Sequence, residues 1–156
     1  MINVEVVSEN NLWNKKIKKK FFFFNSLVSF FPQKYRFIKK RVTLTVLLSK
    51  NQNIQKLNKK FRNKNKSTDV LSFPSEKKFN VKKHSYLGDI IISFEFMNSP
   101  KTINNFEFRN NVMKIFIHGF LHLLGYDHTK LKDFKKMLKE EEKIYKFVKN
   151  KMAKLV

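Results

Sequence analysis

The sequence predicts a single-layer α/β domain (α+β-like), and three observations lead to this prediction. Stretches with strand character and stretches with helix character alternate along the chain, which favours helices packed around one sheet. The 156 residues suffice for a sizeable core, and 42% of them are hydrophobic. No internal repeat and no linker rich in Pro, Gly or Ser divides the chain. We therefore expect one domain over residues 1–156.

The N-terminal part of the chain is predicted to form a strand, a helix and a second strand. Ile2 to Val7 alternates in polarity and contains β-branched residues, as strands do. Leu12 to Phe31 is predicted to be one helix, because its apolar run ends at Pro32, which cannot continue a helix. Arg41 to Leu48 is rich in Val, Thr and Leu and is the clearest strand.

The middle of the chain is predicted to form one helix between strands. Ser49 can cap a helix from about Lys50 to Arg62, in which apolar residues recur at helical spacing. A short strand is expected at Val70–Phe73, stopped by Pro74. Tyr86 to Phe94 is apolar on both faces towards its end, which predicts an interior strand.

Two helices are predicted in the C-terminal part. Residues 95–105 give no clear signal, and Pro100 argues against one continuous helix there. Phe106 to Leu124 is a long apolar helix, and Leu131 to about Lys151 is the final helix. The buried side of this final helix is expected to contain Phe134, Met137, Leu138, Ile144, Tyr145 and Val148.

The charge of the chain favours a polyanionic partner. Thirty-four basic and 12 acidic residues give a net charge of +22, which attracts nucleic acid or, as the alternative, an anionic membrane surface. A general bias towards Lys, Asn and Phe also explains part of this charge. The absence of cysteine excludes disulfides and thiolate metal sites, and it fits a cytoplasmic protein. The basic and phenylalanine-rich segment 15–31 is too short to span a bilayer, so we expect no stable membrane insertion.

Three of the four histidines fall within eleven residues, His118 to His128. His118 and His122 are spaced i, i+4, so a helix places both imidazoles on one face, about 6 Å apart at Cβ. Gly125 can end the helix in the left-handed conformation, and the turn then brings His128 back to the same place. Three nitrogen ligands with a fourth position open are typical of a catalytic zinc, although other divalent ions accept the same ligands.

The spacing of the histidines leaves the substrate open. It matches the metzincin peptidase pattern, in which a glutamate follows the first histidine as general base. Here that position is Gly119, so a peptidase would lack its proton acceptor and a different hydrolysis is favoured. Asp127 could orient a ligand imidazole or cap the turn, whereas Asp69 and Asp89 are expected to bind backbone amides.

Three sequence blocks together resemble the YbeY family of bacterial ribosomal RNA maturation factors, which are endoribonucleases. The first is the histidine run HGFLHLLGYDH, and the second is Leu57-Asn58 followed by Arg62 and by TDVLSFP at 68–74. The third is LGDI at 87–90. Their order and spacing match over roughly residues 40–130, while the N-terminal forty residues and the final helix resemble the family only in outline.

The resemblance implies a mixed sheet of about four strands with about five packed helices. It implies that His118, His122 and His128 hold one Zn²⁺ per chain and that Arg62 is a functional arginine near the metal. The implied activity is metal-dependent cleavage of single-stranded RNA in small-subunit ribosomal RNA maturation and ribosome quality control. The implied partners are single-stranded RNA, ribosomal RNA and the small ribosomal subunit.

The chemistry of phosphodiester cleavage adds a reason for Arg62. A metal could activate a water, or polarise a phosphate oxygen while the RNA 2′-hydroxyl attacks, and both routes build negative charge that needs a cation. Arg62 can bind phosphate in two places, although a basic residue at a helix end also suits the helix dipole. Lysines expected nearby are Lys59, Lys60, Lys64 and Lys66.

Two other functions stay open at this point. One is a ribosome-binding assembly factor whose metal is structural. The other is a metal-dependent hydrolase of another substrate.

Overall fold

The computed structural model describes residues 1–155 and, within them, contains one four-stranded sheet and six α-helices. The strands are β1 (Ile2–Ser8), β2 (Val42–Ser49), β3 (Val70–Pro74) and β4 (Tyr86–Ser93). The helices are α1 (Leu12–Lys16), α2 (Lys20–Ser29), α3 (Asn51–Arg62), α4 (Phe94–Met97), α5 (Asn105–Leu123) and α6 (Leu131–Ala153), with a 3-10 turn at Gln33–Tyr35. The predicted α/β class is confirmed.

The sheet is mixed and has the strand order β1-β2-β4-β3. Strands β1, β2 and β4 run parallel to one another, while β3 pairs with β4 in the antiparallel sense. Strand β3 therefore forms one edge of the sheet, which leaves one side of its backbone open to contacts from other elements. The mixed, four-stranded sheet that the family resemblance implied is confirmed.

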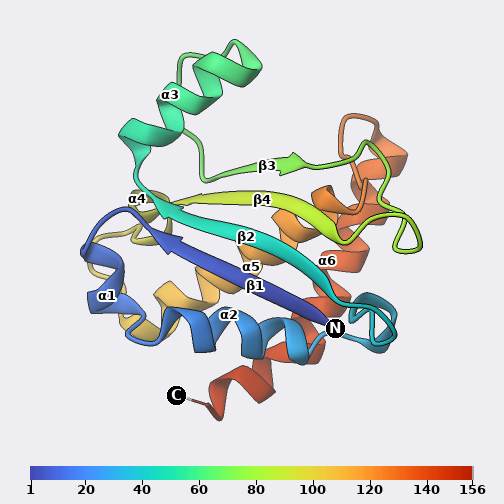
Figure 1. The fold of residues 1–156 in the computed structure, drawn as a ribbon. Helices are drawn as coiled ribbons and strands as arrows, with labels where there is room; N and C mark the ends of the chain where they lie inside the picture. Colours follow the sequence, from blue (N-terminus) through green and yellow to red (C-terminus); the bar gives the residue numbers. More distant parts are fainter. Residues whose placement is uncertain (156) are drawn as a thin grey trace.

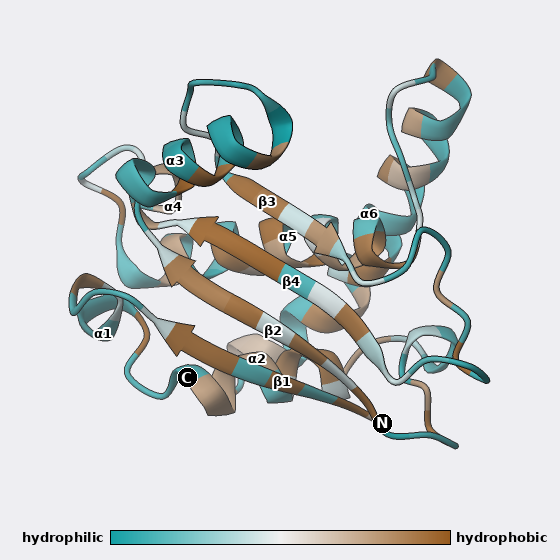
Figure 2. Cartoon of the chain, turned by 45° about the horizontal axis from the view of Figure 1, so that its top comes forward, coloured by the Kyte–Doolittle hydropathy of each residue, from teal (hydrophilic) through white to brown (hydrophobic). Residues whose placement is uncertain are grey.

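The helices cover the two faces of the sheet unequally. Figure 1 shows α1, α2, α5 and α6 on one face and α3 on the other, beside β3. The strands β2 and β4 are mostly hydrophobic (Figure 2), because both lie inside the sheet and are covered by helices. A small second cluster of Ile54, Leu71 and Ile91 packs under α3.

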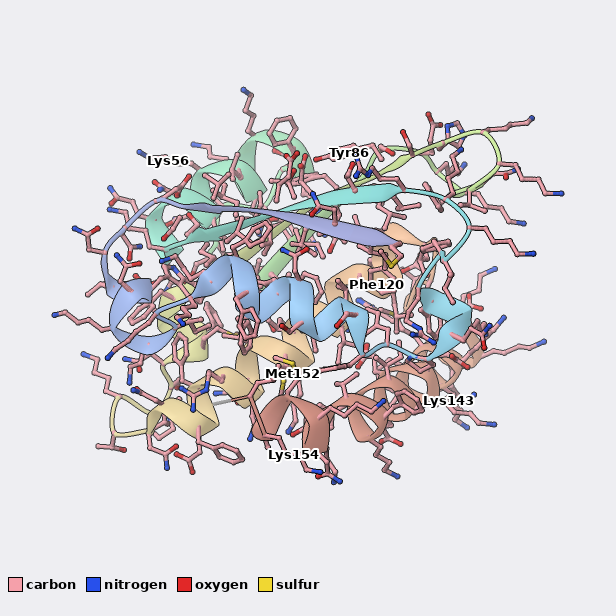
Figure 3. All side chains as sticks on the ribbon, turned by 60° about the horizontal axis from the view of Figure 1, so that its bottom comes forward. Lys56, Tyr86, Phe120, Lys143, Met152 and Lys154 are labelled. Atoms are coloured by element: carbon pink, nitrogen blue, oxygen red, sulfur yellow. The ribbon has the colours of Figure 1, made fainter. Side chains whose placement is uncertain are left out.

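The main core lies between the sheet and the larger group of helices. Its aromatic residues interlock edge to face, as Phe31 and Phe120 do with ring centroids 5.0 Å apart. Figure 3 shows Phe120 in the interior, whereas the labelled lysines Lys56, Lys143 and Lys154 lie at the periphery. The phenylalanine-rich segment contributes to this core through Phe23, Phe24 and Phe31. No helix among residues 1–155 meets the length and hydropathy needed to cross a bilayer.

The prediction of one helix over Leu12–Phe31 is wrong. Helix α1 ends at Lys16, Ile17 has an extended backbone, and α2 begins at Lys20. A continuous helix would place like charges of the Lys15–Lys20 run three and four residues apart, which is unfavourable. The break also turns Ile17 into the core, where it is 4% exposed.

The start of α3 and the end of β4 also differ from prediction. Ser49 does not cap α3: its hydroxyl donates to the carboxylate of Glu9 instead. The first turn of α3 is satisfied from another element, because the N–H of Asn51 donates to Glu95 at 2.9 Å. Phe94 does not end the strand but begins the short helix α4.

The buried stripe of α6 is shifted from the predicted one. Met137, Ile144 and Val148 are buried as predicted, but Phe134 and Leu138 are 47% and 42% exposed. The buried positions continue to Met152 and include Glu140, so the stripe follows the helical period along one line. Apolar character alone did not decide which face of this helix meets the core.

Candidate metal centre

Helix α5 and the turn after it position the three clustered histidines. The helix begins with a capping box, in which Glu107 N–H donates to the Asn104 side chain at 2.8 Å and the Glu107 carboxylate accepts from Asn104 N–H at 3.2 Å. After the helix ends at Leu123, Gly125 has a φ of 101°, in the left-handed region that favours glycine. This turn returns the chain towards the helix, as its glycine predicted.

The structure brings His118, His122 and His128 together. Their candidate ligand atoms all lie within 4.8 Å of one another. The Nε2 atoms of His118 and His122 are 3.1 Å apart, and the ring of His128 is 4.9 Å from that of His122 between centroids. Nitrogen atoms gathered this closely at the end of one helix can face a single ion.

In two of the three histidines, the ring nitrogen that points away from this cluster has a partner. The Nδ1 atom of His118 contacts the carboxylate of Glu141 on α6. The Nδ1–H of His122 donates to the backbone carbonyl of Tyr126 at 2.9 Å. Contacts of this kind fix the orientation and tautomer of a metal-binding imidazole and keep its Nε2 lone pair available.

Burial keeps the central histidine neutral. It lowers the pKa of His122 to about 4, and the neighbouring His118 acts in the same direction. An imidazole with this pKa carries no proton on its second nitrogen near pH 7, so it can donate a lone pair to a metal. Three imidazole nitrogens, two of them on rings oriented by other groups, fit a divalent ion such as Zn²⁺.

Asp127 caps the turn between Gly125 and His128. One carboxylate oxygen accepts the His128 N–H at 2.7 Å, which holds the pKa of Asp127 below its usual value. The side chain therefore caps the turn rather than contacting an imidazole. Asp69 likewise accepts the N–H of Val70 at 2.8 Å, as expected of a short carboxylate at a strand start.

A cavity of about 700 Å³ opens beside the histidines. Arg62, Lys64 and Lys77 line it together with the three imidazoles, so its walls combine the candidate metal ligands with three cations. Of the four lysines predicted near Arg62, Lys64 lines this cavity, and the others lie on exposed surface. The cavity therefore suits an anion placed next to a bound metal.

Ser72 on the edge strand links Arg62 to the histidine helix. The guanidinium of Arg62 donates to the Ser72 carbonyl at 3.0 Å, and its carbon lies 5.8 Å from the centroid of the Phe73 ring. The Ser72 hydroxyl in turn donates to the carbonyl of Gly119 at 3.2 Å. The open edge of β3 thus holds the cation in a fixed relation to the metal ligands.

Gly119 allows α5 to lie directly on the sheet. A Cβ atom at this position would come within 3.0 Å of both Ile90 Cγ2 and Ser72 Oγ. A glutamate, which the peptidase pattern places here, would have to fit into this same contact. The structure therefore explains why a small residue stands between the two helical histidines, and it argues against the peptidase alternative.

We expect Gly119→Ala to destabilise the protein by about 1–3 kcal/mol, because the new methyl group overpacks the contact between helix and sheet. Urea unfolding followed by circular dichroism measures this change. An unchanged unfolding midpoint would show that α5 can move away from β4 without cost.

Glu141 and Ser72 were not predicted from the sequence. Glu141 belongs to an acidic run, Glu140–Glu142, within an otherwise lysine-rich helix, and this local reversal of charge was a usable signal. Ser72 gave no signal of its own, because its role depends on pairing with two other elements. Gly88 permits a close backbone approach: its φ is 135°, and a Cβ there would meet the Phe73 carbonyl.

The chain resembles known proteins over nearly its whole length. The family model described as endoribonuclease YbeY matches residues 7–149. The endoribonuclease YbeY of Pelagibacter ubique is 69% identical over 153 residues, which are 98% of this chain and 100% of that protein. The endoribonuclease YbeY of Borrelia turicatae is 36% identical over 89% of this chain and 94% of its own.

A solved structure shares the fold. The solution structure of a Thermotoga maritima protein superimposes with a TM-score of 0.52 at 25% identity, covering 96% of this chain and 95% of its own. Together with the family match over residues 7–149, this agreement extends beyond the histidine run to the whole arrangement of sheet and helices. The chain belongs to the YbeY family of endoribonucleases.

Proposed function

We propose that this protein is a zinc-dependent endoribonuclease that cleaves single-stranded RNA in the cytoplasm. Its proposed role is the maturation of small-subunit ribosomal RNA and ribosome quality control, as the family resemblance implies. The observation that carries the proposal is the cavity in which the histidine cluster meets Arg62, Lys64 and Lys77. Metal ligands and phosphate-binding cations share one space there.

The residues that would hold the ion are His118, His122 and His128. When bound, a zinc ion supplies Lewis acidity and lowers the pKa of a bound water. Glu141 and the Tyr126 carbonyl keep the first two imidazoles oriented, so little rearrangement is needed on metal binding.

The cations of the cavity would bind the RNA backbone. Arg62 can contact two oxygens of one phosphate, and the negative charge that grows on those oxygens during cleavage strengthens the contact. Lys64 and Lys77 act as point charges on neighbouring phosphates. These contacts read no base, so they support cleavage of many sequences and depend strongly on salt.

Two measurements on the purified protein test the proposal. Metal analysis should give zinc in proportion to protein, and single-stranded RNA should be cleaved internally while a duplex of the same sequence resists. Equal cleavage of duplex, or cleavage that survives complete removal of metal, would contradict the proposal.

Glu141→Gln should weaken metal binding about 10- to 100-fold, because an amide holds the Nδ1–H of His118 less firmly than a carboxylate does. Competition with a chromophoric chelator measures the affinity directly and does not depend on activity. The neighbouring Glu142→Gln removes the same charge from an exposed position and serves as the matched control. Equal affinities of the two variants would remove Glu141 from the metal centre.

A further inference from the structure

A second cavity, of about 520 Å³, lies on the other side of the metal centre. It shares His118 and Asp69 with the cavity that contains Arg62, so the histidine cluster stands between the two. Its other walls come from the short helix α4 and from the middle of α5. A strand of RNA that passes the histidines must enter this space on one side of the cleaved bond.

One face of α5 forms the floor of both cavities. Residues at intervals of three and four lie along one line of this helix, and here they are Asn111, Lys114 or Ile115, His118 and His122. Eleven residues separate the first from the last, which corresponds to about 16 Å along the helix axis. The two cavities are therefore parts of one path across the metal centre.

The two cavities differ in chemistry. The first presents three cations, Arg62, Lys64 and Lys77, against two carboxylates, whereas the second has the single cation Lys114 against two carboxylates, those of Asp69 and Glu141. A phosphate group is attracted to the first cavity, whereas the second cavity offers it little electrostatic attraction. A nucleobase, which is neutral and has amino groups that donate hydrogen bonds, fits the second.

The walls of the second cavity offer what a base needs. Phe96 on α4 is 42% exposed and lines the cavity together with Ile115. Exposed aromatic rings of this kind are the usual stacking partners of bases in single-stranded RNA. Asn111 donates its amide N–H to the Met97 carbonyl at 3.0 Å, so its Oδ1 is the atom that can accept from a base.

We propose that this second cavity is a nucleoside subsite, in which Phe96 stacks on the base next to the cleaved phosphodiester bond. Asn111 contacts the edge of that base. The phosphates on the other side of the bond lie against Arg62. This inference rests on the proposed ribonuclease function, since it assigns one end of the substrate path that this function requires.

Removal of single bases from the RNA tests the subsite. A single-stranded oligomer that the metal-loaded protein cuts at one position is prepared with one abasic nucleotide at each position in turn. For the unaltered protein, loss of the base on one side of the cleaved bond should lower kcat/KM on the order of tenfold. Phe96→Ala should cause a similar loss of kcat/KM with the intact oligomer. With the oligomer that lacks this one base, Phe96→Ala should cause no additional loss, whereas with every other abasic oligomer it should.

Two further variants make the result specific. Phe96→Tyr keeps an aromatic ring and should restore kcat/KM, and Phe106→Ala removes a phenylalanine that is 54% exposed at the far end of α5 and should change nothing. The subsite would be overturned if Phe96→Ala had the same kcat/KM as the unaltered protein. It would also be overturned if the loss from Phe96→Ala and the loss from the missing base multiplied at every abasic position. If the unaltered protein cleaves no RNA, the proposed function fails, and the subsite fails with it.

Discussion

His122→Ala should abolish metal binding and RNA cleavage together. His122 is close to both of the other candidate ligands, with its Nε2 atom 3.1 Å from that of His118 and its ring 4.9 Å from that of His128. Its removal leaves one ligand on the helix and one on the turn, too few to hold an ion against water. A bound metal contributes several kcal/mol of transition-state stabilisation, so we expect cleavage to fall by about 10³-fold or more.

Metal content and cleavage rate are measured on the same preparation, with the thermal unfolding midpoint as a check on folding. His84→Ala is the matched control, because it removes the one histidine outside the cluster, which lies in a loop near Glu76. The control should keep both metal and activity. A His122→Ala protein that retains full cleavage without metal would eliminate the metal mechanism.

The clustering of the three histidines was predictable from the sequence because its geometry is local. Two of its residues are one helical turn apart, and the third follows a glycine whose left-handed backbone reverses the chain. Each step depends on the nearest few residues, whose conformational preferences are strong. The strands were predictable for a similar reason, since short runs of β-branched residues favour strands.

Long-range contacts could not be predicted in this way. Glu141 lies 23 residues from His118, and their contact depends on how α6 crosses α5. The buried stripe of α6 was misplaced for the same reason, because the period of a helix gives its apolar face only approximately. The first turn of α3 receives its side-chain partner from another element, Glu95, whereas the local sequence predicted Ser49 as the cap. Arg62 was predicted near the metal from the family resemblance, and not from its own surroundings.

Arg62→Ala should lower kcat/KM for single-stranded RNA on the order of 10²-fold, because one charged donor to the reacting phosphate is lost. The loss should appear in kcat more than in KM, since the charge on the phosphate oxygens is greatest in the transition state. The metal content should not change, because Arg62 contacts Ser72 and Phe73 and none of the three histidines.

Arg62→Lys separates charge from geometry. Lysine keeps the positive charge but not the planar fork, so it cannot hold the Ser72 carbonyl and two phosphate oxygens at once, and we expect it to recover only part of the activity. Lys59→Ala, three residues away on exposed surface, controls for the general loss of positive charge. If Arg62→Ala and Lys59→Ala weaken RNA binding equally and leave kcat unchanged, Arg62 is one cation among many. A loss of kcat in Arg62→Ala but not in Lys59→Ala, with full metal content in both, would instead assign Arg62 to the reacting phosphate. Both variants lose one positive charge and both keep the metal, so neither factor can explain the difference between them.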